Sequence, residues 1–295
     1  MKKQLLLTGG NGFIGKNIRE SFLAQKYDII APRSSELNLA DTAAVDNYFK
    51  THQFDAVIHA AVKPGHRNAK DPTNLLYTNL RMFENLARHT DRFGRLINLG
   101  SGAVYDSAAD NRQVTEEEIG LRMGKDDHSF CKYIVHKRIE NIKNAVDLNI
   151  FGIFGKYEDW EIRFISNACC KALFDLPITL RQNRRFSYLY APDLMPVLDY
   201  FIEHEPKFKC YNVVPDEETE LLQAAQAVLE VSGKDLPIQV AHEGYGLNYS
   251  GSNARLRKDI PSLCFTPLKQ AIADLFSFYC ENKKLLNYNL LLRDK

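Results

Sequence analysis

The feature that most constrains the fold of this chain is a glycine-rich turn close to its start. Thr8–Gly15 reads T-G-G-N-G-F-I-G, with glycines at a G-x-x-G-x-x-G spacing. A short buried strand is expected at 3–7, before the turn, and an amphipathic helix at 16–23, after it. Such a turn lets the backbone approach a pyrophosphate, whose negative charge the helix N-terminus favours. The segment predicts a nucleotide-binding strand–turn–helix unit, with a tight turn that binds no ligand as the alternative.

Short apolar runs alternate with helical patterns through the first half of the chain, which is typical of βαβ units and a parallel sheet. Further strands are expected at 27–31, 54–61, 95–99 and 147–151. Helices are expected at 41–49, 75–88, 129–145, 163–174, 191–202, 221–232 and 267–281, and a strand at 185–189. The alternation weakens beyond residue 155. We therefore predict an α/β Rossmann fold, a doubly wound parallel sheet at 1–155, with a smaller C-terminal substrate-binding lobe at 156–295 that returns some segments to the first domain.

Charge and cysteine usage exclude several classes of protein. The 295 residues include 38 Lys and Arg against 37 Asp and Glu, a net charge of +1, which gives no electrostatic case for nucleic acid or an anionic membrane. Six scattered cysteines without a C-x-x-C, and histidines without metal-ligand spacing, predict neither disulfides nor a metal site. The apolar run at 5–7 is too short for a signal peptide, and no run reaches transmembrane length. We expect a cytoplasmic protein.

Three residues with acid–base or hydrogen-bonding chemistry follow the turn. Tyr133 and Lys137 are four residues apart in the long predicted helix, so they share a face. A phenol with a pKa of about 10 is a poor acid at neutral pH, and a nearby ammonium lowers that pKa. Ser101 follows the strand 95–99 and can hydrogen-bond the carbonyl oxygen that Tyr133 protonates. We expect these three to be catalytic, with Lys137 also holding a cofactor ribose. A core tyrosine beside a solvated lysine is the alternative.

These motifs together resemble the extended short-chain dehydrogenase/reductases of the NAD-dependent epimerase/dehydratase family. The matching pieces are the T-G-G-x-G-F-I-G turn, His59-Ala60-Ala61, Ser101, Tyr133-x-x-x-Lys137 and Phe154-Gly155. Within the family, Glu36-Leu37-Asn38-Leu39 and His59–Lys63 are most similar to GDP-fucose synthase and related 4-keto-sugar reductases. The resemblance implies a nucleotide-sugar substrate and a homodimer paired through the helix that carries Tyr133.

The resemblance also implies which residues bind the cofactor and the substrate. The implied cofactor-binding residues are Gly9, Gly12, Phe13, Ile14, Gly15, Arg33, Ser34, Asn38, Leu39, Ala60, Ala61, Lys63, Tyr133 and Lys137. Asn38 and Leu39 are expected beside the adenine. The implied substrate-binding residues are Ala103, Arg184 and Arg185, the arginines gripping a diphosphate through bidentate contacts. Tyr245 and Tyr249 can stack on a base or sugar, and a plain aromatic loop is the alternative.

The departures from the family pattern narrow the chemistry. GDP-fucose synthases place an epimerising cysteine two residues after the serine, where this chain has Ala103, and their partner histidine is missing near Arg163. The 4,6-dehydratases of the family carry Asp-Glu just after the serine or threonine, where this chain has Gly102-Ala103. The residues for epimerisation and for elimination of water are therefore absent from these positions. Of the reactions catalysed in this family, hydride transfer at a carbonyl is the one that needs none of the missing residues.

The end of the second strand favours NADP(H) over NAD(H). No Asp or Glu closes that strand, where NAD enzymes hold the ribose diol. Instead Arg33, Ser34 and Ser35 offer a cation and two hydroxyls, which suit a 2′-phosphate. An exposed loop charge is the alternative for Arg33. The sequence thus predicts an NADPH-dependent reductase of a GDP-, CDP- or dTDP-linked 4-keto-deoxysugar. The open alternatives are a 4-epimerase with tightly held NAD and a non-catalytic NADP-binding protein.

Overall fold

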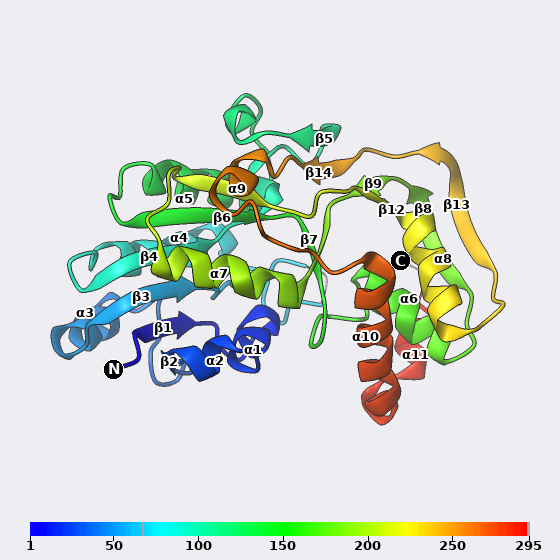
Figure 1. Ribbon diagram of the computed structural model, residues 1–295, viewed down its shortest axis with the longest axis horizontal. Coiled ribbons are helices and arrows are strands. Elements are labelled where there is room, and N and C mark those ends of the chain that lie inside the picture. The colour runs from blue at the N-terminus through cyan, green and yellow to red at the C-terminus, as the bar shows by residue number, and fades with distance from the viewer. Residues whose placement is uncertain (67, 294–295) are drawn as a thin grey trace.

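A six-stranded, wholly parallel sheet forms the centre of the molecule (Figure 1). The computed structural model describes residues 1–66 and 68–293. The sheet strands are β1 (Gln4–Thr8), β2 (Asp28–Ile30), β3 (Phe54–His59), β4 (Phe93–Leu99), β6 (Ala145–Ile150) and β11 (Cys210–Val213). Their order is β11-β6-β4-β3-β1-β2, and every neighbouring pair is parallel. The prediction of a doubly wound α/β sheet is confirmed.

Both faces of the sheet are covered by helices because its strands are apolar on both sides. Leu5 and Leu7 point to one face, while Leu6 points to the other, and all three are fully buried. The first face packs against α1 (Phe13–Arg19), α2 (Leu23–Lys26), α7 (Leu194–Glu203) and α9 (Ala254–Asp259). The second face packs against α3 (Thr42–Thr51), α4 (Leu75–Ala87) and α5 (Asp127–Ile139).

The strand order places a topological switch between β1 and β3. The chain leaves β1 toward β2 and then crosses back to β3, β4 and β6. In open α/β sheets, ligands bind beyond the carboxyl ends of the strands at such a switch. In Figure 1 the arrows of β1 and β3 point toward the second lobe, so this edge faces the rest of the chain.

The second lobe is built around a helical core of its own. Its helices are α6 (Phe164–Leu173), α8 (Leu221–Ser232), α10 (Leu268–Glu281) and α11 (Tyr288–Leu291), which share one apolar cluster. Its short strands are β7 (Gly152–Phe154), β8 (Ile178–Asn183), β9 (Arg185–Phe186), β10 (Tyr188–Tyr190), β12 (Thr219–Glu220), β13 (Ile238–Tyr245) and β14 (Tyr249–Gly251), with β5 (Asn111–Val114) from the first half pairing with β14. Helix α7 and strand β11 return to the main sheet, and the domain boundary at 155 stays a prediction.

Several predicted elements differ from the structure at their ends, and two of them show the physical reason. The helix predicted at 129–145 begins at Asp127, behind the N-cap Asp126, and ends at Ile139. It stops early because Ala145 already pairs with Leu96 across β4 and β6, so tertiary strand pairing overrides the local pattern. The strand predicted at 185–189 is divided into β9 and β10, which pair with different partners.

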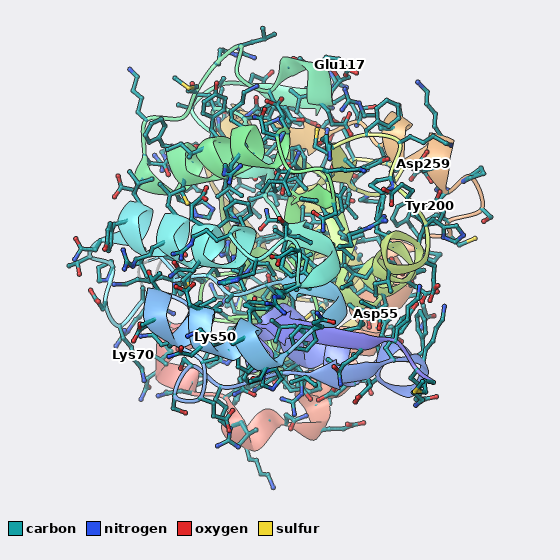
Figure 2. The ribbon with its side chains drawn as sticks, turned by 90° about the vertical axis from the view of Figure 1, so that its left-hand side faces the viewer. Lys50, Asp55, Lys70, Glu117, Tyr200 and Asp259 are labelled. Atoms are coloured by element: carbon teal, nitrogen blue, oxygen red, sulfur yellow. The ribbon has the colours of Figure 1, made fainter. Side chains whose placement is uncertain are left out.

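The amino ends of the strands form the opposite edge of the sheet. Figure 2 looks onto this side, where Asp55 stands at the start of β3 and accepts a hydrogen bond of 2.7 Å from the backbone N–H of Gln4. Among the described residues, no helix is long and apolar enough to cross a membrane.

Candidate active site at the carboxyl ends of the strands

The glycine turn folds tightly between β1 and α1. Gly9 has a φ of +70°, and a Cβ placed on it would lie 2.7 Å from the backbone nitrogen of Ala61. A Cβ on Gly15 would lie 2.2 Å from the carbonyl oxygen of Gly9. Gly12 is the N-cap of α1, and no side chain caps that helix. Only glycine fits these two close approaches, and the uncapped backbone amides suit a pyrophosphate, so the turn fits the dinucleotide predicted for it.

Phe13 and Ile14 open helix α1 directly behind the turn. Ile14 packs against the apolar cluster on the first face of the sheet. The ring of Phe13 approaches Gly155 at the end of β7, where a Cβ would come within 3.7 Å of it. Both side chains therefore pack against the protein behind the turn, so a ligand at the turn would contact the backbone of these two residues and not their side chains.

The loop after β2 holds the residues predicted to surround the adenosine. Arg33 and Ser34 are exposed, and the carboxylate of Glu36 accepts a hydrogen bond of 2.7 Å from the backbone N–H of Arg33. Asn38 is exposed and closes a local turn onto Ala40. Leu39 is 7% exposed and packs into the core on the second face of the sheet, so its side chain belongs to the core.

Arg19 is a cation at the turn that the sequence analysis missed. Its guanidinium lies 3.0 Å from Oδ1 of Asn11 and 3.4 Å from the carbonyl oxygen of Gly10. A Cβ on Gly10 would touch the side chain of Ala31, just after β2. Arg19 therefore stands near the same strand end as Arg33. The available signal was its position one helical turn after Gly15.

The end of β3 joins the glycine turn through a buried hydrogen-bond pair. Nδ1 of His59 lies 2.8 Å from Oγ1 of Thr8, and that hydroxyl accepts from the backbone N–H of Ala61 at 3.2 Å. Ala60 and Ala61 are partly buried beside the turn. The ammonium of Lys63 pairs with Asp71 at 2.6 Å. The backbone of Ala60 and Ala61 therefore packs directly against the glycine turn.

Ser101 stands just beyond β4, at the head of the short 3-10 turn Gly102–Val104. Its hydroxyl accepts a hydrogen bond of 3.1 Å from the backbone N–H of Ala103, which is itself buried. The side chain of Tyr249, on β14, is hydrogen-bonded to Ser101. Burial raises the pKa of Tyr249 to about 12. The second lobe therefore contributes a neutral phenol directly beside the predicted catalytic serine.

Among the described residues, no hydrogen bond or ion pair joins the predicted pair of Tyr133 and Lys137 to Ser101. Tyr133 packs against an apolar cluster around Val104 and Tyr105, and its ring lies beneath Gly120. The side chain of Lys137 is 49% exposed and forms an ion pair with Glu140. That contact raises the pKa of Lys137, and the charge of Cys210 raises it further. Cys210 is on β11, at the edge of the sheet farthest from β1. Their assignment as catalytic and cofactor-binding residues stays a prediction, and Lys132 on the same helix is the alternative that the structure offers.

Lys132 is the lysine of α5 that points to the site. Its ammonium donates a hydrogen bond of 3.2 Å to the carbonyl oxygen of Leu99, the last residue of β4. Burial lowers the pKa of Lys132, an effect opposed by the charge of Asp147. The pKa of His59 falls to about 3 through burial and, secondarily, the charge of Lys132. Adjacent residues on a helix point about 100° apart, so Lys132 reaches β4 while Tyr133 turns away.

His128 precedes Lys132 by four residues and therefore shares its face of α5. The ring is exposed, and its pKa is lowered by partial burial and by the charges of Lys132 and Arg163. The same spacing, H-x-x-x-K, is present in the sequence five residues before Tyr133 and Lys137. His128 therefore lies within range of the charges of Lys132 and Arg163, on the helix whose Lys132 reaches the end of β4.

Arginines from the second lobe face the same region. The charges of Arg163 and Arg184 both lower the pKa of Tyr249, against the larger effect of burial. Arg184 also stacks over the ring of Phe186 at 4.5 Å. Arg185 points elsewhere, into an ion pair of 2.9 Å with Glu220. The predicted arginine pair is therefore divided: Arg184 faces the site, whereas Arg185 holds the lobe together, and Arg163 joins Arg184.

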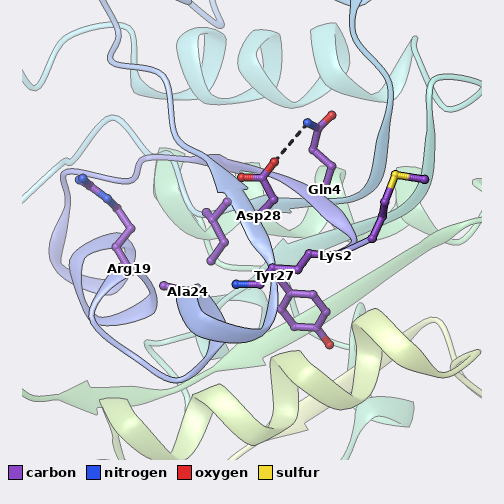
Figure 3. A pocket seen from close by; sticks show the side chains of 8 residues that line it. Lys2, Gln4, Arg19, Ala24, Tyr27 and Asp28 are labelled. Carbon is purple, nitrogen blue, oxygen red and sulfur yellow. Dashed lines mark hydrogen bonds between the residues drawn. The ribbon is translucent and has the colours of Figure 1, made fainter.

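A separate hollow of about 780 Å³ lies beside β2, at the edge of the sheet (Figure 3). Gln4 and Asp28 line it at the first residues of β1 and β2, with the ring of Tyr27 close by, and Arg19 lines it from helix α1. Its lining residues do not include Ser101 or the residues around it. Within residues 1–66 and 68–293, no cluster of three His, Cys, Asp or Glu side chains suited to a metal ion occurs.

The fold and the glycine turn define a nucleotide-binding enzyme, and comparison with known proteins gives its family. The chain belongs to the NAD dependent epimerase/dehydratase family, whose model matches residues 5–213. It is 29% identical to a GDP-L-colitose synthase of Yersinia pseudotuberculosis over 227 residues, 69% of this chain and 73% of that protein. It is 30% identical to a GDP-L-fucose synthase of Azorhizobium caulinodans over 177 residues, 53% of this chain and 54% of that protein.

Solved structures share the whole fold at low identity. A GDP-L-fucose synthetase from Naegleria fowleri bound to NADP superposes with a TM-score of 0.80 at 17% identity, covering 96% of this chain and 94% of that one. A GDP-mannoheptose C4 reductase from Campylobacter jejuni with NADP bound gives a TM-score of 0.81 at 17% identity, covering 95% and 98%. The predictions of the family and of an NAD(P)-dependent enzyme acting on a nucleotide sugar are confirmed, at the level of a reductase or epimerase.

Proposed function

We propose that this protein reduces the 4-keto group of a GDP-, CDP- or dTDP-linked deoxysugar with NADPH, in the biosynthesis of activated sugars. The observation that carries the proposal is the surroundings of Ser101. Its hydroxyl faces Tyr249, with cations nearby, while positions 102 and 103 are Gly and Ala. Neither position offers a carboxyl or thiol for elimination or epimerisation, so the polar groups that remain suit carbonyl reduction.

Different residues of the chain would have different roles in such a reduction. The glycine turn Gly9–Gly15 would hold the pyrophosphate, and the exposed Arg33 and Ser34 would bind the adenosine 2′-phosphate. Lys132 would hold the nicotinamide ribose in place of Lys137. A bound nicotinamide supplies the hydride. Ser101 would donate a hydrogen bond to the carbonyl oxygen and polarise it.

The second lobe would hold the sugar nucleotide. Arg163 and Arg184 place two positive charges near Tyr249, and neither has a carboxylate contact within ion-pair distance in the described residues. Diphosphate is the chemical group that suits two guanidinium donors. The small side chain of Ala103 would leave room for the sugar ring. These contacts support a nucleotide-linked substrate over a free sugar.

The choice of NADPH rests on the loop after β2. Arg33 and Ser34 are exposed there, Arg19 lies by the glycine turn, and two relatives of the same fold are described as NADP-bound. A 4-epimerase with tightly held NAD, or a non-catalytic NADP-binding protein, is the alternative. An epimerase would copurify with NAD and show no net cofactor consumption.

The test is a panel of substrates with the purified protein. GDP-, CDP- and dTDP-4-keto-6-deoxyhexoses are each mixed with NADPH, and loss of NADPH absorbance is followed together with the sugar product by mass spectrometry. We expect one nucleotide series to consume NADPH in equal amounts with the sugar. Absence of NADPH oxidation with all three would end the reductase proposal.

We also propose a homodimer located in the cytoplasm. Tyr77 on α4 and Phe130 on α5 are large exposed side chains on the two helices through which a dimer would form. All six cysteines are free in the structure, which suits a reducing compartment. Native mass spectrometry checks the dimer, and Phe130→Glu should shift the protein to monomer.

A further inference from the structure

Tyr133 packs near Gly120 and has no hydrogen bond to Ser101 among the described residues, so α5 offers no phenol in contact with that serine. A carbonyl reduction needs a proton for the oxygen as well as a hydride for the carbon, and the donor must lie within hydrogen-bond reach, directly or through one water. Four side chains near Ser101 carry an exchangeable proton: Lys132, His128, Tyr249 and Ser101 itself. Their positions and surroundings distinguish them.

We propose that His128 donates the proton to the substrate carbonyl oxygen, with Lys132 as its positioning and charge partner. This inference rests on the proposed reductase function. His128 is the second residue of α5, and its backbone N–H donates to the N-cap Asp126 at 3.1 Å. The anchored first turn directs the imidazole along the face on which Lys132 reaches Leu99. Because α5 packs against the 3-10 turn after Ser101, this face borders the site.

Tyr249 is less suited to donate. Burial raises its pKa to about 12, and its hydroxyl is engaged with Ser101. A neutral phenol in that position orients the serine hydroxyl. Lys132 is held by the carbonyl oxygen of Leu99 and is partly buried, so its proton is directed into the protein. His128 is exposed, so it can recover a proton from water after each turnover.

The proton and electron balance of the step is complete with NADPH as the reductant. The hydride adds to the carbonyl carbon, the C=O π electrons move to oxygen, and that oxygen takes the proton from the imidazolium of His128. A C–H and an O–H bond form, NADPH becomes NADP⁺, and His128 is left neutral. A proton from solvent restores the imidazolium.

The charges around His128 make the step sensitive to pH. Burial lowers the pKa of the imidazole most, the charges of Lys132 on its own helix and Arg163 before α6 lower it further, and Asp126 raises it. His59 and Asp147 face Lys132 from β3 and β6. An imidazolium donor works only while protonated, so reduction should decline as pH rises through a pKa below the ordinary histidine value of about 6.5. Bound diphosphate beside Arg163 would shift this decline upward.

The activity test compares the wild type with four variants, on whichever 4-keto sugar the wild type reduces. His128→Phe should lower kcat about 100-fold or more. His128→Tyr, which places a phenol beside Lys132, should keep reduction and move the decline to higher pH. His204→Phe is the matched control, because His204 is an exposed histidine after α7, outside the site. Tyr249→Phe should keep the pH profile of the wild type.

A second measurement does not depend on turnover. The imidazole of His128 is titrated by NMR in the wild type and in Lys132→Met, with assignment by His128→Phe. We expect a pKa below the ordinary value that rises in Lys132→Met. Wild-type protein that never oxidises NADPH overturns the proposed function and the inference with it. Wild-type turnover that survives in His128→Phe, or a His128 pKa indifferent to Lys132→Met, overturns the inference alone.

Discussion

Asp147 places a carboxylate in the buried layer beneath the site lysine. It is 2% exposed, accepts a hydrogen bond of 2.6 Å from Asn98, and lies 3.6 Å from His136. Its charge raises the pKa of Lys132 against burial. We predict that Asp147→Asn leaves the Lys132 ammonium uncompensated and lowers the free energy of unfolding by about 3 kcal/mol. Urea denaturation measures the change, and Asp91→Asn, at an exposed carboxylate, should have little effect.

At the scale of single residues, the sequence placed Ser101 and the glycines of the site, but it did not determine which lysine of α5 faces them. Ser101 and the glycines lie where strand ends and turns dictate, because each follows a buried strand directly. The pair predicted on α5 lies five residues after the pair that we propose. H-x-x-x-K at 128–132 and Y-x-x-x-K at 133–137 follow each other on the same helix, and spacing alone does not say which face meets β4. That choice is made by packing, since Tyr133 fills an apolar cluster while Lys132 reaches Leu99.

Helix α6 is tied to the turn before it by a buried acid. Glu158 is hydrogen-bonded to Ser166 on α6, and burial raises the pKa of Glu158 to about 8. The native state therefore binds a proton between about pH 5 and 8 that the unfolded chain releases near pH 4.5. Stability from this group is full below pH 4.5 and declines as pH rises to 8, by at most about 1.4 kcal/mol per pH unit.

We predict that Glu158→Gln removes this decline, because a neutral amide has no proton to lose. Unfolding midpoints in urea from pH 5 to 8 should fall less in the variant than in the wild type. Glu230→Gln on α8 provides the control, since Glu230 is an exposed partner of Lys269. Parallel curves for wild type and Glu158→Gln would contradict the assigned pKa.

Elements differ in how far local sequence defines them. Helix α8 begins and ends at the predicted residues, because a capping box at Glu220 and the left-handed Gly233 mark both ends. Strands β8 and β13 were not predicted, and their partners lie about 60 residues apart in the chain. Nor was β11, which joins the main sheet from the second half. Pairing at such distances leaves no local pattern to identify it.

At the scale of the whole molecule, the two halves meet at the edge where we propose that the ligands bind. The first half supplies the glycine turn, Ser101 and Lys132, whereas the second supplies Tyr249, Arg163 and Arg184. A ligand that binds only this assembled edge must stabilise the entire fold, by about 2.7 kcal/mol at a concentration 100 times its Kd. The melting temperature is therefore a direct measure of cofactor choice.

We predict that NADP⁺ raises the melting temperature more than NAD⁺ at equal concentration, and that Arg33→Ala removes most of the difference. A charge-assisted contact to the 2′-phosphate contributes about 1.5–3 kcal/mol, which is roughly 10- to 100-fold in affinity. NAD⁺ lacks that phosphate, so its stabilisation should be the same in wild type and variant. Arg92→Ala, at a partly exposed arginine on the loop before β4, is the control. If Arg33→Ala weakens NAD⁺ and NADP⁺ equally, Arg33 acts on the loop and Arg19 becomes the 2′-phosphate ligand to test.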